Sequence, residues 1–282
     1  MKKKGEKQKK ENWLSVQVIL MLAEIFLITQ TLGLIAAHNL YLLGAAQAPI
    51  TQNINDVENG LYLFAIIIVM TIIIFIALRM RRTAKFLWAV EALAIFSTSL
   101  IVFSAFLPTE DLLVILLTAL VLIARYWKRN SIFIRDIAGM IAIIGAGAYV
   151  GISLGMLPVL VFVIILAVYD IIAVFFTKHM VEIGSAVTKR NFAFTIAMPT
   201  KKHKFELGNG DLVIPLIVAS SVLVNGPFQN NSLIAGLCLI ASFIGLLLSI
   251  YSVSAWRKPM PALPPQTLLM IIVLVAGLLL WV

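Results

Sequence analysis

Long apolar segments alternate with short polar connections along almost the whole chain. A helix that crosses the hydrocarbon core of a bilayer needs about 20 consecutive, mostly apolar residues. The pattern predicts nine transmembrane helices, of which the fourth is short, and therefore an all-α polytopic membrane protein. The predicted segments are Trp13–Ala37, Leu61–Leu78, Phe86–Leu107, Leu112–Ala124, Ile137–Leu154, Leu157–Phe176, Leu207–Val224, Leu233–Ala255 and Ala262–Val282.

All 22 Lys and Arg residues fall on one predicted side of the membrane. They precede the first segment and follow the second, fourth, sixth and eighth, whereas the opposite connections carry acids or neutral residues. Because Lys and Arg collect in cytoplasmic loops, we expect the N-terminus in the cytoplasm and Val282 outside. The expected location is the plasma membrane.

The composition agrees with a membrane protein, since 61% of the residues are hydrophobic and 12% are charged. The net charge of +9 is explained by the basic residues on one side of the bilayer, so it gives no support to nucleic-acid binding. Cys238 is the single cysteine, and no intrachain disulfide is expected.

Four acidic residues lie inside predicted membrane segments: Glu24, Glu91, Asp170 and Asp211. An ionisable residue at this depth is costly and marks a candidate functional site. For Glu24 we expect a structural role, with a bond to a polar residue across the bundle. For Glu91 we expect a side chain that reaches back to the cytoplasmic surface.

Asp170 and Asp211 differ from the other two acids because they lie at matching depth. Lys178 follows Asp170 by eight positions and Lys204 precedes Asp211 by seven, so at ~1.5 Å per helical residue each carboxyl lies roughly 10 to 12 Å beyond a basic connection. Two consecutive helices can bring these carboxyls together to share a proton, as an aspartyl hydrolase requires. Buried carboxylates also suit a proton- or cation-coupled transporter, and that alternative stays open at this point.

Three short motifs surround the two aspartates. They are Tyr169-Asp170 in the sixth segment, Gly208-Asn209-Gly210-Asp211 at the start of the seventh and Pro261-Ala262-Leu263-Pro264 at the start of the ninth. The glycines allow close approach by a helix, a substrate strand or water. The prolines delay the start of the ninth helix, and non-helical backbone at membrane depth is tolerated where it lines a cavity or is buried in protein.

In order, spacing and membrane side, these motifs resemble those of the presenilin and signal peptide peptidase family of intramembrane aspartyl proteases, in its microbial, archaeal form. The resemblance implies a GxGD-type aspartic endopeptidase that hydrolyses peptide bonds within the transmembrane segments of single-span proteins. It also implies that Asp170 and Asp211 form the catalytic dyad. The residues that would shape the active site are Tyr169, Gly208, Gly210, Pro261, Ala262 and Leu263.

The expected chemistry follows from two carboxyls in a medium of low dielectric, where both cannot ionise cheaply. The ionised member takes a proton from a bound water, which attacks the peptide carbonyl, and the protonated partner polarises the carbonyl oxygen. No cofactor is needed. No metal site is expected either, because the chain has no HExxH motif and its three histidines lie at segment ends or in connections.

The chain divides into a basic cytoplasmic tail (1–12), a scaffold of segments one to five (13–155) and a catalytic portion (156–282) with the cytoplasmic loop 177–206. The expected partners are the transmembrane segments of substrate proteins and the lipid bilayer. This loop is short beside that of eukaryotic presenilins, which implies activity without obligatory subunits; a homo-oligomer stays open. Asn209 departs from the larger apolar residue common at its position in the family, which implies a different substrate preference or local hydration.

The cytoplasmic loop also carries a strand pattern. Large and small side chains alternate from Asn191 to Met198, and a second short strand is expected at His203–Leu207. We expect this region to hold an unwound substrate segment by edge-strand addition, because a helical peptide bond is shielded from attack. The candidate substrate-binding residues are Phe192, Phe194, Ile196 and Leu207.

Overall fold

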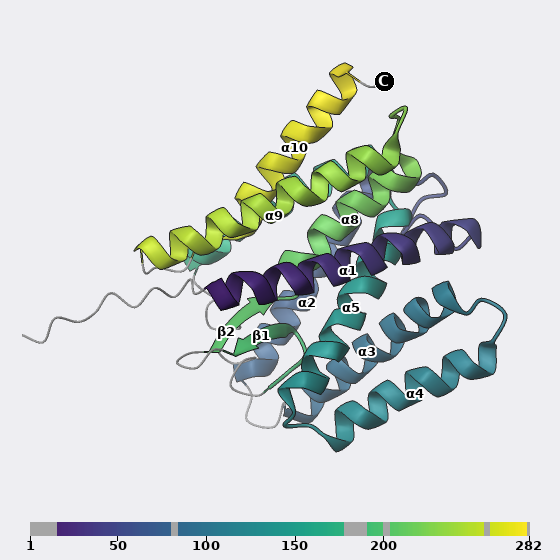
Figure 1. Ribbon diagram of the computed structural model, residues 1–282, viewed down its shortest axis with the longest axis vertical. Helices are drawn as coiled ribbons and strands as arrows, with labels where there is room; N and C mark the ends of the chain where they lie inside the picture. Colours follow the sequence, from purple (N-terminus) through teal and green to yellow (C-terminus); the bar gives the residue numbers. More distant parts are fainter. Residues whose placement is uncertain (1–15, 80–83, 178–190, 200–203, 257–259, 281–282) are drawn as a thin grey trace, which may run out of the picture.

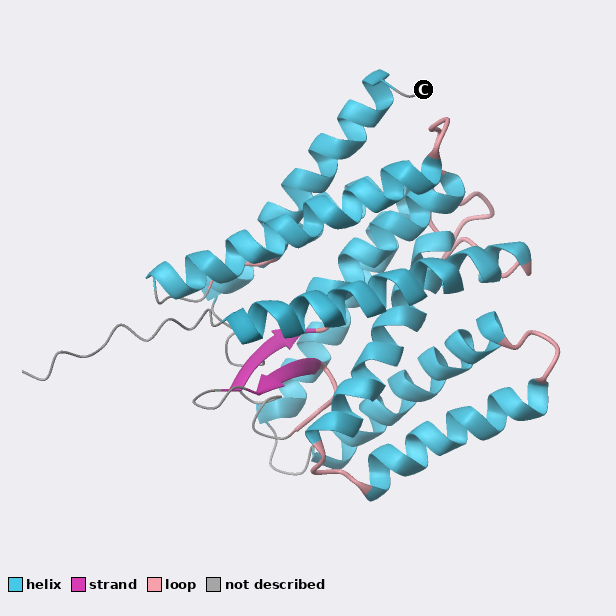
Figure 2. Cartoon of the chain, viewed as in Figure 1, coloured by secondary structure: helices cyan, strands magenta, loops and turns pink. Residues whose placement is uncertain are grey.

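The computed structural model describes residues 16–79, 84–177, 191–199, 204–256 and 260–280. These residues form nine α-helices, one π-helical segment and two β-strands (Figure 1). Figure 2 shows the two strands as a small element beside a bundle that is otherwise helical. In chain order the elements are α1 (Val16–Leu42), α2 (Val57–Arg79), α3 (Ala84–Phe106), α4 (Asp111–Trp127), α5 (Ile132–Ile152), α6 (Met156–Ile171), η1 (Ile172–Thr177), β1 (Thr195–Pro199), β2 (Lys204–Gly208), α8 (Gly210–Asn225), α9 (Asn231–Trp256) and α10 (Leu263–Leu280).

Each predicted segment overlaps one α-helix, so the all-α architecture is confirmed. Among the described residues, seven helices are long and apolar enough to cross a membrane: α1, α2, α3, α5, α6 with its continuation into η1, α9 and α10. The other two are shorter, since α4 has 17 residues and α8 has 16. The fourth segment is therefore short, as predicted. The predicted tail 1–12 and much of the loop 177–206 lie outside the described residues.

The seventh segment differs from the prediction at its start. The helix begins at Gly210 instead of Leu207, because Leu207 and Gly208 belong to β2. Glycine has a weak helix propensity, so the glycine-rich turn favours a late helix start. The depth derived for Asp211 from seven helical positions is therefore wrong, since strand residues rise about 3.3 Å each.

The helix α8 lies at the centre of the bundle, where it packs against α5, α9, α1 and α6. Figure 1 shows α3 and α4 on one side of this centre and α9 and α10 on the other. The outer helices expose large apolar side chains such as Leu112, which is 72% exposed, and Leu279, which is 79% exposed. An apolar exterior of this extent is typical of a surface that faces lipid.

Leu216 of α8 fills a site between two glycines. A Cβ atom at Gly33 of α1, or at Gly147 of α5, would overlap the Leu216 side chain. Small residues let membrane helices approach closely, and the resulting van der Waals contacts stabilise their association. These contacts fix α8, which carries Asp211, against two long helices.

The strands β1 and β2 form an antiparallel pair with Thr195 opposite Gly208 and Met198 opposite Phe205. The two predicted strands are thus confirmed, with shifted ends, although His203 lies outside the described residues. β1 packs against α5 and α1, and its first four residues are buried. The hairpin is therefore held in the bundle and leads directly into α8.

Candidate active site

Asp170 and Asp211 line the same cavity, which has a volume of about 610 Å³. The aspartates come from α6 and α8, and the walls are mainly apolar side chains of α2, α6 and α8. Phe194 directly before β1 and Thr195 at its start also line the cavity, as do Met260, Ala262 and Leu263 before and at the start of α10. Among the described residues that line it, the two aspartates are the acidic ones. The structure thus brings together the two aspartates on which the sequence prediction rests.

Asp170 lies in the last turn of α6, directly before the π-helical segment η1. π-helical segments inside or beside α-helices are frequent at functional sites. The backbone N–H of Leu263 donates a hydrogen bond to Oδ2 of Asp170 over 3.2 Å. Since α10 begins at Leu263, the Pro261-Ala262-Leu263 motif reaches the aspartate through its backbone, and the N-terminus of a helix favours a negative charge.

Asp211 is the second residue of α8 and follows the turn formed by Gly208, Asn209 and Gly210. A Cβ atom at Gly208 would lie 3.6 Å from Oδ2 of Asp211, in ordinary contact, and a Cβ at Gly210 would meet open space. Asn209 also lines the cavity, and its Nδ2 donates a hydrogen bond to the carbonyl of Ala193 over 2.8 Å. This bond ties the turn to the segment before β1.

Pro215 lies inside α8, one helical turn after Asp211. Proline has no N–H, so it supplies no hydrogen bond to the carbonyl of Asp211. Gln30 of α1 supports the next residue, since its Nε2 donates to the carbonyl of Leu212 over 3.0 Å. The first turn of α8 is therefore held partly by a neighbouring helix.

A second cavity of about 280 Å³ adjoins the first and shares Asp211, Met260 and Ala262 with it. Phe205, Glu206 and Leu207 of β2 line one wall of this second cavity, and residues of α9 line another. The hairpin therefore lines a second cavity that reaches Asp211.

Of the remaining predicted site residues, some line the two cavities and others are buried in the core. Tyr169 packs edge-on against Phe64 of α2, with ring centroids 6.0 Å apart. Phe194 lines the main cavity and Leu207 the second. Phe192 and Ile196 are 1% and 0% exposed and belong to the hydrophobic core. Their placement favours a role in supporting β1 over direct contact with a substrate.

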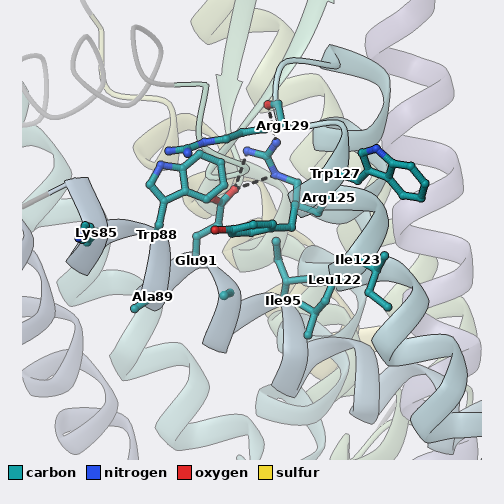
Figure 3. A pocket seen from close by; sticks show the side chains of 12 residues that line it. Lys85, Trp88, Ala89, Glu91, Ile95, Leu122, Ile123, Arg125, Trp127 and Arg129 are labelled. Atoms are coloured by element: carbon teal, nitrogen blue, oxygen red, sulfur yellow. Dashed lines mark hydrogen bonds and ion pairs between the residues drawn. The ribbon is translucent and has the colours of Figure 1, made fainter.

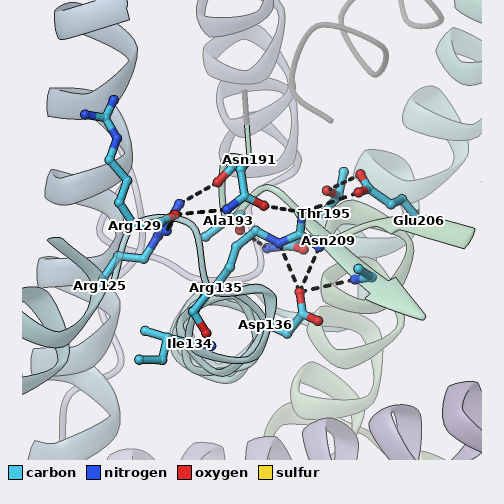
Figure 4. A network of polar contacts seen from close by, with 12 residues as sticks. Arg125, Arg129, Ile134, Arg135, Asp136, Asn191, Ala193, Thr195, Glu206 and Asn209 are labelled. Atoms are coloured by element: carbon cyan, nitrogen blue, oxygen red, sulfur yellow. Dashed lines mark hydrogen bonds and ion pairs between the residues drawn. The ribbon is translucent and has the colours of Figure 1, made fainter. Parts of the chain in front are cut away.

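A buried polar network connects the hairpin to α5 (Figure 4). Arg135 is fully buried and forms ion pairs with Asp136 over 2.9 Å and with Glu206 over 3.3 Å. The N–H of Ala197 donates to Asp136 over 3.2 Å, and the Thr195 hydroxyl donates to Glu206 over 3.0 Å. This network was not predicted from the sequence, although the adjacent opposite charges of Arg135 and Asp136 at the start of an apolar segment were a signal for it.

Glu91 does not reach the surface, contrary to the prediction. It is 1% exposed and forms an ion pair with the buried Arg125 of α4 over 2.9 Å. The same carboxylate oxygen accepts the N–H of Ala193 over 2.7 Å. Glu24 lies exposed on α1, and its predicted bond to a polar residue across the bundle stays a prediction.

The family model described as "Signal-peptide peptidase, presenilin aspartyl protease" matches residues 23–280. The chain belongs to this family. It is therefore a presenilin-family intramembrane aspartyl protease and a multi-pass membrane protein. This assignment favours a protease over the transporter that stayed open in the sequence.

Two solved structures are similar to this presenilin-family chain over almost its whole length. One, described as "Structure of a presenilin family intramembrane aspartate protease in C222 space group", covers 93% of this chain and 99% of its own, with 26% identity and a TM-score of 0.69. The other, described in the same words but in the P2 space group, covers 95% and 99%, with 25% identity and a TM-score of 0.67. A comparison with curated proteins gave no match.

The described residues of this protease hold no group of three or more His, Cys, Asp or Glu side chains that fits a metal ion. The polar groups that line its main cavity are instead those of the two aspartates, Thr195 and Asn209.

Proposed function

We propose that Asp170 and Asp211 are the catalytic dyad of this presenilin-family protease. The observation that carries the proposal is their position on one largely apolar cavity, contributed by two different helices. Apolar walls lower the local dielectric, so two carboxylates there repel each other strongly. One proton shared between the two carboxyls removes this repulsion.

Both carboxyls have a feature that favours negative charge, namely the Leu263 N–H for Asp170 and the first turn of α8 for Asp211. Whichever carboxyl is ionised takes a proton from a water in the cavity, and this water attacks the peptide carbonyl. The protonated partner donates a hydrogen bond to the carbonyl oxygen and then protonates the departing nitrogen. No covalent intermediate is required.

The dyad is tested by cleavage of a single-span reporter protein with detergent-purified protease, in the presence and absence of a transition-state analogue of aspartyl proteases. We expect Asp170→Asn and Asp211→Asn each to lower the rate by at least about 10²-fold, because each removes a proton donor or acceptor of the reaction. Asp111→Asn is the matched control, since Asp111 is exposed at the start of α4. Parental rates in both dyad variants, with the fold intact, would show that the chemistry uses other groups.

For the substrate, we propose a transmembrane segment of a single-span protein that is unwound and added to the outer edge of β2. The N–H of Ala197 points to Asp136, away from β2. Because pairing alternates along an antiparallel ladder, the N–H and C=O of Gly208 point away from β1. Gly208 lines the main cavity, so a strand bonded there passes the two aspartates.

Among the candidate substrate-binding residues, this proposal assigns contact roles to Phe194 and Leu207, which line the two cavities. Phe192 and Ile196 keep an indirect role, since both are buried in the core beside the hairpin. The Pro261-Ala262-Leu263 motif, Gly208 and Gly210 shape the cavity wall, and Tyr169 positions the last turn of α6 against α2.

We further propose nine membrane spans with a cytoplasmic N-terminus in the plasma membrane, supported by the placement of all 22 basic residues on one side. This orientation favours substrates with an outside N-terminus. The proposal includes no obligatory partner subunit, and association of several copies is compatible with it.

A further inference from the structure

A groove of about 1180 Å³ lies between α3 and α4, away from the two aspartates. Figure 3 shows charged and aromatic side chains gathered at one end of this groove and apolar side chains at the other. The charged end lies where α4 runs into the basic connection before α5. The groove therefore has a polar end near one membrane surface and an apolar end deeper in the bilayer.

The polar end carries a net positive charge. Its charged lining residues are Lys85, Glu91, Arg125 and Arg129. Glu91 and Arg125 neutralise each other in their buried ion pair, so the exposed Lys85 and Arg129 supply the unbalanced charge. The guanidinium of Arg129 stacks over the Trp88 ring, 3.7 Å from its centroid, and this contact holds the cation at the mouth of the groove.

The apolar end offers room beside small side chains. Ala89 and Ala92 of α3 are exposed there, opposite Leu122 and Ile123 of α4. Next to the charged end, Trp127 is 84% exposed, as is typical of aromatic residues at a membrane interface. A cationic mouth above an apolar groove matches a molecule with an anionic head and a hydrocarbon tail.

We propose that this groove is a binding site for an anionic phospholipid, with the phosphate on Lys85 and Arg129 and an acyl chain along Ala89, Ala92, Leu122 and Ile123. Basic pockets between transmembrane helices have the chemistry that binds acidic headgroups. Among the described residues that line the groove, Glu91 is the one with a carboxylate, and its pairing with Arg125 keeps that carboxylate from repelling the phosphate. Neither aspartate takes part, so the site is independent of the proposed dyad.

The test is native mass spectrometry of the full-length protein in detergent, titrated with phosphatidylglycerol or with phosphatidylcholine of the same acyl chains. We expect the parent to bind one phosphatidylglycerol more tightly than phosphatidylcholine. Lys85→Gln and Arg129→Gln are each expected to weaken the binding of phosphatidylglycerol about fivefold, which corresponds to the loss of one cation near a headgroup. Lys128→Gln, which removes an exposed neighbouring charge outside the groove lining, should leave binding unchanged.

A second pair of variants tests the channel for the acyl chain. Ala92→Trp fills the groove and should weaken the binding of phosphatidylglycerol. Leu93→Trp changes an exposed neighbouring position outside the lining and should leave binding unchanged. Equal binding of the two lipids, equal loss in Lys128→Gln, or full competition by inorganic phosphate would overturn the proposal. Asp211→Asn is expected to bind phosphatidylglycerol like the parent, so the result does not depend on the proposed protease mechanism.

Discussion

The hydrogen bond from the Leu263 N–H to Asp170 connects the proline-rich motif to the chemistry through the backbone alone. A proline at position 263 removes this donor, and it fits the local geometry because proline is favoured at the first position of a helix. We expect Leu263→Pro to lower cleavage roughly 10-fold to 100-fold, since a hydrogen bond to a charged group contributes about 1.5 to 3 kcal/mol. The measurement is kcat on the single-span reporter.

Leu263→Ala is the matched control for this change, because it keeps the N–H and removes only the side chain. Leu263 is 9% exposed and packs in the core, so both variants should lose some stability. If alanine and proline lower kcat equally, the side chain matters and the backbone donor does not.

Glu91 and Arg125 show how much of a residue's role depends on a partner far away in sequence. The two are separated by 34 positions, so nothing near Glu91 in the chain indicates its partner. We expect Glu91→Leu to destabilise the protein by about 3 to 5 kcal/mol, because it leaves the Arg125 charge buried and unpaired. Thermal unfolding in detergent, monitored by circular dichroism, measures this change.

The double variant Glu91→Leu with Arg125→Met removes both charges and should recover part of the lost stability. Glu110→Gln is the surface control, since Glu110 is exposed and its side chain makes no capping hydrogen bond. A double variant that is less stable than Glu91→Leu would show that the Arg125 bonds to the carbonyls of Arg129 and Asn191 outweigh the ion pair.

At the scale of elements, the addition of a substrate strand to β2 depends on the backbone groups along the outer edge of that strand. Gly208→Pro removes the N–H that points away from β1, whereas Gly208→Ala keeps it and adds a methyl group that fits 3.6 Å from Asp211. We expect the proline variant to cleave at least about 10-fold more slowly than the alanine variant, through the loss of one intermolecular hydrogen bond and the obstructed strand edge. Rates of reporter cleavage are compared at equal amounts of folded protein.

A similar loss in both Gly208 variants would indicate crowding of Asp211 and contradict strand addition at this position. The integrity of the hairpin can be followed independently by the thermal stability of both variants. Only a difference between them in cleavage, at equal stability, supports a role for the Gly208 N–H.

The hairpin also shows which local features the sequence carries. Alternation of large and small residues from Asn191 onward correctly predicted β1, because this pattern is a local property of the chain. The start of α8 was predicted too early, because hydropathy does not distinguish a leucine in a strand from a leucine in a helix. The pairing of Leu207 with Ile196 depends on contacts between the two strands of the hairpin. The spacing of apolar residues does not distinguish the π-helical turn after Asp170 from the α-helix before it, so the sequence offered no signal for this turn.

At the scale of the whole molecule, hydropathy located the nine α-helices formed by the described residues, but it did not place them around α8. That arrangement depends on close contacts such as Gly33 and Gly147 against Leu216, which join residues far apart in the chain. The two aspartates could be predicted as a pair because their motifs were recognisable. Their common cavity needed the packing of α6, α8 and the start of α10.

The short helix α4 offers a decisive test of the proposed topology. At ~1.5 Å per residue its 17 residues extend roughly 25 Å, somewhat less than a hydrocarbon core of about 30 Å. Local thinning of the bilayer accommodates such a difference at modest cost. Glu110 and Lys128 flank this helix, so we expect them on opposite sides of the membrane, with Glu110 outside.

The measurement is labelling of single cysteines by a membrane-impermeant maleimide, in a Cys238→Ala background that removes the buried native thiol. In intact cells Glu110→Cys should react and Lys128→Cys should react only after permeabilisation. Labelling of both or of neither in intact cells would mean that α4 does not span the membrane. The number of spans would then fall, and the proposed orientation could not hold both for the helices before α4 and for those after it. The opposite pattern, with Lys128→Cys accessible from outside, would keep nine spans and invert the molecule, so that the proposed active site would open to the exterior.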